Sequence, residues 1–129
     1  MKYVIIFLLF WGVVVYSTIS HSHEFTPTYP KMKPSFVEKV SVTKMKLFNK
    51  RNDAKYYQIS VWDADWKPIK FASQSRIVEV DYLETKQFEV YIRDKDLGRA
   101  KYICTESKLI SDDVISTGIA SRICSKIQR

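Results

Sequence analysis

Two cysteines, Cys104 and Cys124, are the residues of this sequence whose type and spacing most directly suggest chemistry. A pair of thiols can form a disulfide, bind a metal ion or supply a nucleophile. Two thiolates fill only half of a tetrahedral zinc site, and a catalytic thiol needs a base nearby. The cellular compartment decides between these alternatives, because thiols pair in oxidising spaces and stay reduced in the cytosol.

The N-terminus indicates export. A lysine at position 2 precedes the apolar run YVIIFLLFWGVVVY, which is followed by the small polar stretch STISHS and by no basic stop-transfer cluster. This pattern is typical of a secretory signal peptide. We therefore predict a signal peptide over residues 1–22, cleaved before His23, with cleavage before His21 as the alternative. The mature protein would be periplasmic or secreted, without stable membrane insertion after cleavage.

Export favours the disulfide over the other two fates of the cysteines. With no third cysteine in the chain, Cys104 and Cys124 most simply pair with each other. Both lie in segments with the residue pattern of strands, AKYICTES and SRICSKI, and we expect these strands to be neighbours. Closing a loop of this length would stabilise the fold by about 3 kcal/mol in the chain-entropy model.

The charged residues are spread along the chain. There are 21 Lys and Arg against 14 Asp and Glu, a formal net charge of +7. This excess favours anionic partners such as lipid headgroups, acidic glycans or a protein carboxylate, although a solvated surface of mixed charge is the simpler interpretation. Nucleic acid is not an expected partner, because the protein is exported and lacks a basic stripe interleaved with aromatic residues.

Alternation of apolar and polar residues predicts an all-β protein. In TKMKLFN, Met45 and Leu47 share one face while Lys44 and Lys46 share the other, as in a half-buried strand. We expect the turn KRND to join this strand to the next in an antiparallel hairpin. The predicted strands lie in TKMKLFN, KYYQISVWD, RIVEVDYL, KQFEVYIRD, KYICTES and SRICSKI. Residues 108–118 are predicted to form a long loop.

These strands predict an antiparallel β-sandwich over residues 37–129. Three prolines, Pro27, Pro30 and Pro34, predict an extended N-terminal segment over residues 23–36. We expect this segment to be an arm or a leading edge strand. The mature chain then has the length of one domain.

Carboxylates occur in pairs where turns are expected, so we predict that they accept backbone hydrogen bonds. These pairs are Asp63/Asp65, Asp94/Asp96 and Asp112/Asp113. Calcium ligation by the first pair is the alternative, although the spacing of a known calcium loop is missing. No glycosidase cleft or phosphate loop is indicated. We predict that the protein is not an enzyme and has neither a cofactor nor a resident metal ion.

The mature N-terminus offers a metal-binding alternative. Cleavage before His21 would leave His-Ser-His, whose terminal amine, two amides and third-residue imidazole can hold Cu(II) or Ni(II) in a square plane. Cleavage before His23 would leave one terminal histidine, whose amine and imidazole chelate copper only with help from other ligands.

The stretch AKYIC resembles the Ala-x-Tyr-x-Cys sequence of immunoglobulin strand F. The resemblance implies that the hydroxyl of Tyr102 closes the corner leading into this strand. In an antibody domain the partner cysteine lies upstream on strand B, whereas Cys124 lies downstream of Cys104. The resemblance therefore implies that the sandwich over residues 37–129 is an immunoglobulin-like antiparallel β-sandwich, and not an antibody-type domain.

A longer region, from Val40 to Thr105, resembles the N-terminal domain of the PapD-like periplasmic pilus-assembly chaperones, including their single-domain relatives. The resemblance lies in KLFNKRNDAKYYQISVWDADWKPIKF and RIVEVDYLETKQFEVYIRDKD. It implies that an exposed sheet edge lends a strand to an incomplete protein subunit. Members of the full type have two domains and a basic pair that anchors the client's terminal carboxylate. By charge alone, the candidates here are Lys39, Lys44 and Lys126.

This resemblance would place partner binding on the last strand, at Ile119, Ile123, Ile127 and Lys126. The alternative is that the isoleucines are ordinary core residues. The sequence thus predicts an exported chaperone-like assembly factor that binds an extended protein client by β-strand addition. The alternative function is that of a secreted or virion-associated structural or adhesion module.

Overall fold

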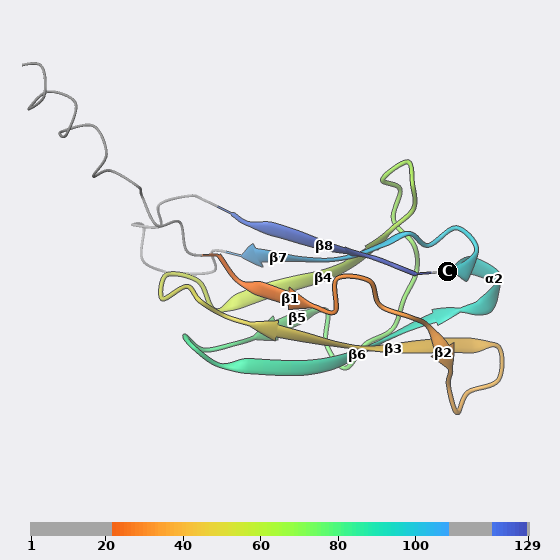
Figure 1. Ribbon diagram of the computed structural model, residues 1–129, viewed down its shortest axis with the longest axis horizontal. Coiled ribbons are helices and arrows are strands. Elements are labelled where there is room, and N and C mark those ends of the chain that lie inside the picture. The colour runs from red at the N-terminus through yellow and green to blue at the C-terminus, as the bar shows by residue number, and fades with distance from the viewer. Residues whose placement is uncertain (1–21, 109–119, 129) are drawn as a thin grey trace, which may run out of the picture.

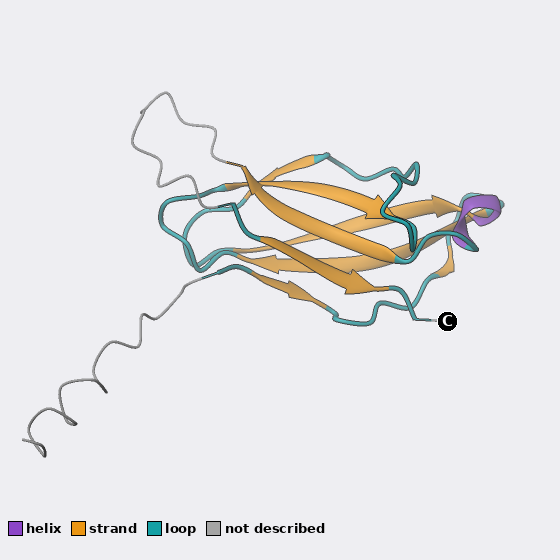
Figure 2. Cartoon of the chain, turned by 90° about the horizontal axis from the view of Figure 1, so that it is seen from above, coloured by secondary structure: helices purple, strands orange, loops and turns teal. Residues whose placement is uncertain are grey.

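Two antiparallel β-sheets, packed face to face, make up the part of the protein that the computed structural model describes, residues 22–108 and 120–128 (Figures 1 and 2). The first sheet contains β1 (Glu24–Thr26), β2 (Lys33–Pro34), β3 (Val40–Phe48) and β6 (Thr85–Arg93). The second contains β5 (Ile77–Glu79), β4 (Tyr56–Trp62), β7 (Tyr102–Lys108) and β8 (Arg122–Lys126), in that order. The predicted all-β antiparallel architecture is confirmed.

The core lies between the sheets and is built by the predicted alternation. Met45 and Leu47 of β3 are fully buried, whereas Lys44 and Lys46 are exposed. The same alternation buries one face of β4, β6 and β7. Each large apolar side chain that leaves water stabilises the fold by about 1.5–3 kcal/mol. The central core residues are Met45, Leu47, Tyr57, Ile59, Val61, Phe88, Val90, Ile92 and Ile103.

The prediction that β3 and β4 form a hairpin is wrong, because they lie in different sheets. The connection between them is organised by the buried amide of Asn49. Its Nδ2 donates to the carbonyls of Ala54 (2.7 Å) and Val80 (2.8 Å). Its Oδ1 accepts the Arg51 N–H (2.9 Å) and the Tyr57 hydroxyl. These bonds turn the chain across the core and join the turn to the end of β5.

The proline-containing N-terminal segment contributes to both sheets. Strand β1 pairs with the end of β3 and β2 with its beginning. Between them, after a cis Thr26–Pro27 bond, the chain leaves β3 and reaches β8, where the Lys126 N–H donates to the Thr28 carbonyl (3.0 Å). The segment therefore contains two short strands, and it also closes part of one side of the sandwich.

Two local features differ from expectation. A short helix, α2 (Asp94–Leu97), follows β6 where only a turn was expected. The carboxylate of Asp96 pairs there with Arg93 (2.7 Å) and Arg99 (3.1 Å) and not with backbone groups. The segment RIVEVDYL holds only the three-residue strand β5. No helix within the described residues is long and apolar enough to cross a membrane.

Candidate functional site

Strand β8 lies at the margin of the second sheet, with β7 as its one strand neighbour there (Figure 1). The Ser107 N–H donates to the Ser121 carbonyl (2.9 Å), and the Ile127 N–H donates to the Lys101 carbonyl (2.8 Å). In an antiparallel pair the bonding residues alternate along each strand. The odd-numbered residues of β8 therefore bond to β7, and the even-numbered residues direct their N–H and C=O groups away from it.

The outward side of β8 is only partly covered. The N-terminal segment takes up its last part, since the Lys126 N–H bonds to the Thr28 carbonyl. The outward N–H and C=O groups of Arg122 and Cys124 have no hydrogen-bond partner among residues 22–108 and 120–128. A strand edge of this kind can pair with a further strand.

The four residues predicted to bind a partner occupy different environments. Ile123 is half-buried and packs against the core, while Ile127 is 6% exposed and belongs to the core itself. Lys126 is exposed. Ile119 lies outside the described residues. Their role in partner binding stays a prediction.

The two cysteines form a disulfide that joins β7 to β8, as predicted. Cys104 lies directly opposite Cys124 in the register, with 4.0 Å between the Cα atoms. Ile103 and Thr105 face the core, so the disulfide lies on the outer face of the sheet. It holds β8 to β7, while on the opposite edge the outward groups of Arg122 and Cys124 bond to no described residue, although β1 lies near β8 there.

A stack of aromatic rings and one guanidinium covers the outer face beside the disulfide. The rings of Trp66 and Tyr102 are parallel, with centroids 4.6 Å apart. The guanidinium of Arg122 lies 4.8 Å from the Trp62 ring and 5.3 Å from the Trp66 ring. The expected tyrosine corner is therefore wrong: the Tyr102 ring lies on the outer face, and its hydroxyl has no hydrogen-bond partner in the described part of the chain.

Sequence reasoning missed this stack, because it depends on an unusual backbone conformation. Trp66 has a φ of 59°, in the left-handed region that few non-glycine residues adopt. The turn is held by Asp63, whose Oδ1 accepts the N–H groups of Asp65 (2.8 Å) and Lys67 (2.9 Å). The predicted role of Asp63 in backbone bonding is thus confirmed. The pair at 112–113 lies outside the described residues.

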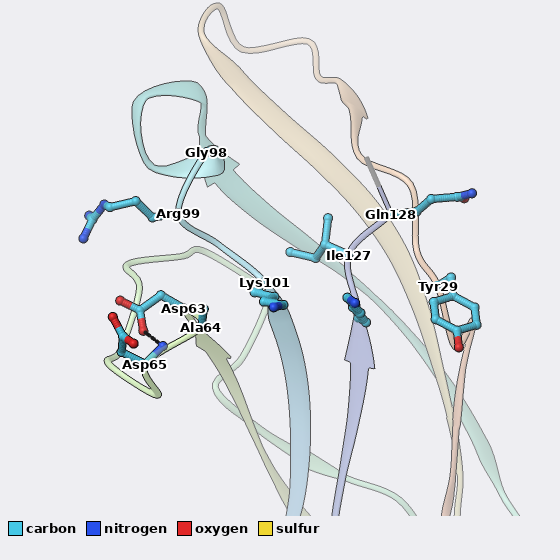
Figure 3. A pocket seen from close by; sticks show the side chains of 10 residues that line it. Tyr29, Asp63, Ala64, Asp65, Gly98, Arg99, Lys101, Ile127 and Gln128 are labelled. Carbon is cyan, nitrogen blue, oxygen red and sulfur yellow. Dashed lines mark hydrogen bonds between the residues drawn. The ribbon is translucent and has the colours of Figure 1, made fainter.

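An open pocket of about 730 Å³ lies at the C-terminal end of β8 (Figure 3). Its basic residues, Arg99, Lys101 and Lys126, come from the segment before β7 and from β8, and Asp63 and Asp65 line it on the side of Arg99. The pocket thus presents ammonium and guanidinium groups at the point where the open edge of β8 ends. The two carboxylates offset part of this charge, so the formal excess in the pocket is positive but small.

The three lysines considered as anchors by charge alone lie in different parts of the fold. Lys126 lines the pocket at the end of β8. Lys39 precedes β3, and Lys44 lies within it, so both belong to the other sheet. The basic neighbour of Lys126 is instead Lys101, which the sequence did not single out.

His23 is buried at the other end of β8. Its Nε2 lies 2.9 Å from the Thr105 Oγ1, its Nδ1 lies 3.2 Å from the Ser121 Oγ, and its ring packs against Tyr57. Burial, helped by the charge of Arg51, lowers the pKa of His23 to about 4. A copper site at the mature N-terminus would require this imidazole to leave the cluster. Within the described residues, no group of three or more His, Cys, Asp or Glu side chains is placed to bind a metal ion.

Comparison with known proteins identifies the fold. No protein-family model and no curated protein sequence matches the chain. The chain is similar to the E. coli chaperone DraB, with a TM-score of 0.63, 16% identity, and coverage of 83% of this chain and 53% of that one. It is also similar to a structure of the Salmonella enterica SafA pilin in complex with the SafB chaperone, with a TM-score of 0.63, 14% identity, and coverage of 86% and 55%.

The chain therefore spans about half the length of these two solved chains. At these identities the similarity establishes the fold, which is the immunoglobulin-like sandwich of the PapD-like chaperones, as the resemblance predicted. In this sandwich β5, β4, β7 and β8 form one layer, and β8, the last strand of the described residues, lies at its edge.

Proposed function

We propose that this protein is an exported chaperone-like assembly factor that binds an extended segment of a protein client by β-strand addition along β8. The single observation that carries the proposal is the open edge of β8, where the N–H and C=O groups of Arg122 and Cys124 point away from β7. A client strand would satisfy these groups with main-chain hydrogen bonds. The disulfide supports the proposal, because it holds the edge in place before the client arrives.

Side chains of β8 would add apolar contact to the backbone pairing. Ile123 lies at the margin of the core and is half-buried, so a client side chain can cover its remaining surface. Ile119 is proposed to continue the same row toward the N-terminal end of the strand. Ile127 already contributes to the core of this domain, and its proposed part is to hold the strand in position.

The pocket at the end of β8 is proposed to receive the carboxylate at the client's C-terminus. Lys126 and Lys101 supply positive charge there, next to the open edge. An ammonium-carboxylate hydrogen bond is stronger than a neutral one and would fix the register of the bound strand. The chaperones DraB and SafB support this function by their shared fold.

A substitution at Arg122 tests the proposal without disturbing the β7–β8 pairing. Arg122→Pro removes the outward N–H and also fixes the backbone φ of residue 122, but it removes no β7–β8 hydrogen bond, because the N–H of an even-numbered residue does not bond to β7. Tagged protein is recovered from its native host, and bound partners are identified by mass spectrometry. We expect the wild type and Arg122→Ala to carry one strand-deficient partner that Arg122→Pro does not carry.

The outcome distinguishes the proposed chaperone from a structural or adhesion module. A module would be recovered within an assembled particle, and Arg122→Pro would be incorporated as well as Arg122→Ala. Equal partner recovery by both variants, with the melting temperature of each close to that of the wild type, would contradict strand addition at β8. The aromatic stack loses its guanidinium in both variants, so this effect cancels in the comparison.

A further inference from the structure

The outer face of the first sheet carries lysines that strand addition at β8 does not use. In the register, Lys33 lies opposite Val42, which lies opposite Tyr91, so these residues form one row across β2, β3 and β6. Lys44 and Lys46 continue the same face of β3, because the residues between them are directed into the core. All three lysines are exposed.

A groove of about 490 Å³ crosses this face where the N-terminal segment leaves β3 for β8. Lys31, Lys33 and Lys44 line it. None of these lysines forms an ion pair with a described residue. The carboxylate in the groove, that of Glu89, accepts the hydroxyl of Tyr91. The groove therefore carries three ammonium groups against the single carboxylate of Glu89, a net positive charge.

An apolar tip stands at the edge of the same face. The turn between β2 and β3 exposes 89% of Phe36 and 46% of Val37. The turn is ordered by its own hydrogen bonds, from the Val37 N–H to the Ser35 hydroxyl (3.1 Å) and from the Ser35 N–H to the Val40 carbonyl (3.0 Å). The Phe36 ring meets the Tyr91 ring edge to face, with centroids 6.3 Å apart. The tip thus belongs to the same surface as the lysine groove.

We propose that this face docks on an anionic membrane surface. Phe36 and Val37 enter the boundary between headgroups and acyl chains, and Lys31, Lys33 and Lys44 contact lipid phosphates. Either contact alone would bind weakly, but an apolar insertion and a cluster of lysines together provide the two signals that peripheral binding requires. The chain would lie on the membrane without spanning it.

The apolar tip favours a lipid surface over an acidic glycan as the partner. Phenylalanine and valine side chains have no polar atom that could bond to a sugar hydroxyl, whereas both gain free energy on leaving water for an apolar medium. Docking by this face would leave β8 accessible, because β8 belongs to the other layer of the sandwich (Figure 1). A client and a membrane could then be bound together.

Vesicle co-sedimentation tests this proposal. The chain is expressed from residue 22 onward, which contains both sheets and omits the apolar N-terminal run that would itself bind lipid. It is mixed with vesicles of phosphatidylcholine alone or with vesicles that also contain phosphatidylglycerol. We expect binding to the anionic vesicles only, and release when the salt concentration is raised.

Matched substitutions locate the contact. Phe36→Ser with Val37→Ser should weaken binding by roughly tenfold or more, whereas Tyr82→Ser, at another exposed aromatic residue, should have no effect. Lys33→Glu should weaken binding by roughly tenfold, whereas Lys67→Glu makes the same charge change in the Trp66 turn and should leave binding nearly unchanged. Because all five substituted side chains are exposed, folding is not expected to suffer, and circular dichroism checks this.

Three results would overturn the proposal. The first is an absence of binding to either kind of vesicle, and the second is equal binding to both kinds. The third is retention on immobilised heparin that Phe36→Ser does not reduce, together with no binding to vesicles, which would assign the face to an acidic glycan. None of these results depends on whether β8 accepts a client strand.

Discussion

The Nε2 of His23 lies 2.9 Å from the Oγ1 of Thr105, within a cluster that joins the N-terminal segment to β7 and β8. His23 is only 1% exposed, and the guanidinium of Arg51 lies in the same cluster, bonded to Ser107 (3.2 Å). The cluster therefore accepts a neutral imidazole and disfavours a charged one. This relationship ties the stability of the fold to pH.

Acidification should destabilise the protein through His23. The pKa of this imidazole is about 4 in the folded protein and 6.5 when unperturbed, so between these values the unfolded chain binds a proton that the folded chain excludes. The stability present above pH 6.5 is then lost progressively as the pH falls toward 4, by up to about 3 kcal/mol. Urea denaturation at a series of pH values measures the effect.

A His23→Gln variant is the control for this prediction. Glutamine keeps hydrogen-bonding capacity at this position but does not titrate, so the loss of stability between pH 6.5 and 4.5 should shrink markedly. An unchanged pH profile in His23→Gln would show that other groups are responsible.

Removal of the Asn49 amide should destabilise the fold severely. Asn49→Ala would leave the carbonyls of Ala54 and Val80 buried without their donor, and the Arg51 N–H without its acceptor. We expect a loss of about 3 kcal/mol or more in the free energy of unfolding. Tyr57→Phe removes one bond to the same amide and should cost about 1 kcal/mol. Equal losses for the two variants would contradict this ranking.

The disulfide should be present in the purified protein and should contribute to its stability. Thiol titration of the denatured, unreduced protein is expected to find no free thiol. Replacing both cysteines by serine should lower the free energy of unfolding by about 3 kcal/mol. Two titratable thiols in the protein recovered after export would refute the pairing.

The left-handed backbone at Trp66 predicts that glycine there does not destabilise the fold relative to alanine, in contrast to the usual order in a strand. Trp66→Ala and Trp66→Gly both lose the stack on Tyr102, but only glycine adopts a φ of 59° without steric cost. Trp66→Gly should therefore be at least as stable as Trp66→Ala. At Trp62, in the extended backbone of β4, the glycine variant should be less stable than the alanine variant by about 1 kcal/mol. Thermal denaturation of the four variants measures both differences.

The strands could be predicted well from the sequence, because the alternation of apolar and polar residues along a strand follows the burial of its two faces. Met45 and Leu47 between lysines could be assigned to the core face without any knowledge of neighbouring strands. The disulfide followed from the cysteine count and the expected compartment. The assignment of each strand to a sheet was harder to predict. The expected β3–β4 hairpin was wrong, because Asn49 directs the chain across the core.

The candidate site was only partly predictable, since strand order decides which backbone groups stay open. Nothing in the residues of β8 indicates that Arg122 and Cys124, and not their neighbours, face away from β7. The pairing of Lys126 with Lys101 in one pocket depends on contact between segments distant in sequence. The Trp66 stack depends on a backbone conformation that the residue type disfavours.

Amide hydrogen exchange along β8 tests the central claim most directly. In the isolated protein we predict rapid exchange at the Arg122 and Cys124 N–H groups, which face outward, and protection at Ile123 and Ser125, which bond to β7. When the partner recovered from the host is bound, the first two amides should become protected as well. Protection of Arg122 and Cys124 in the isolated protein, or their continued rapid exchange in the complex, would contradict an open edge that accepts a client strand.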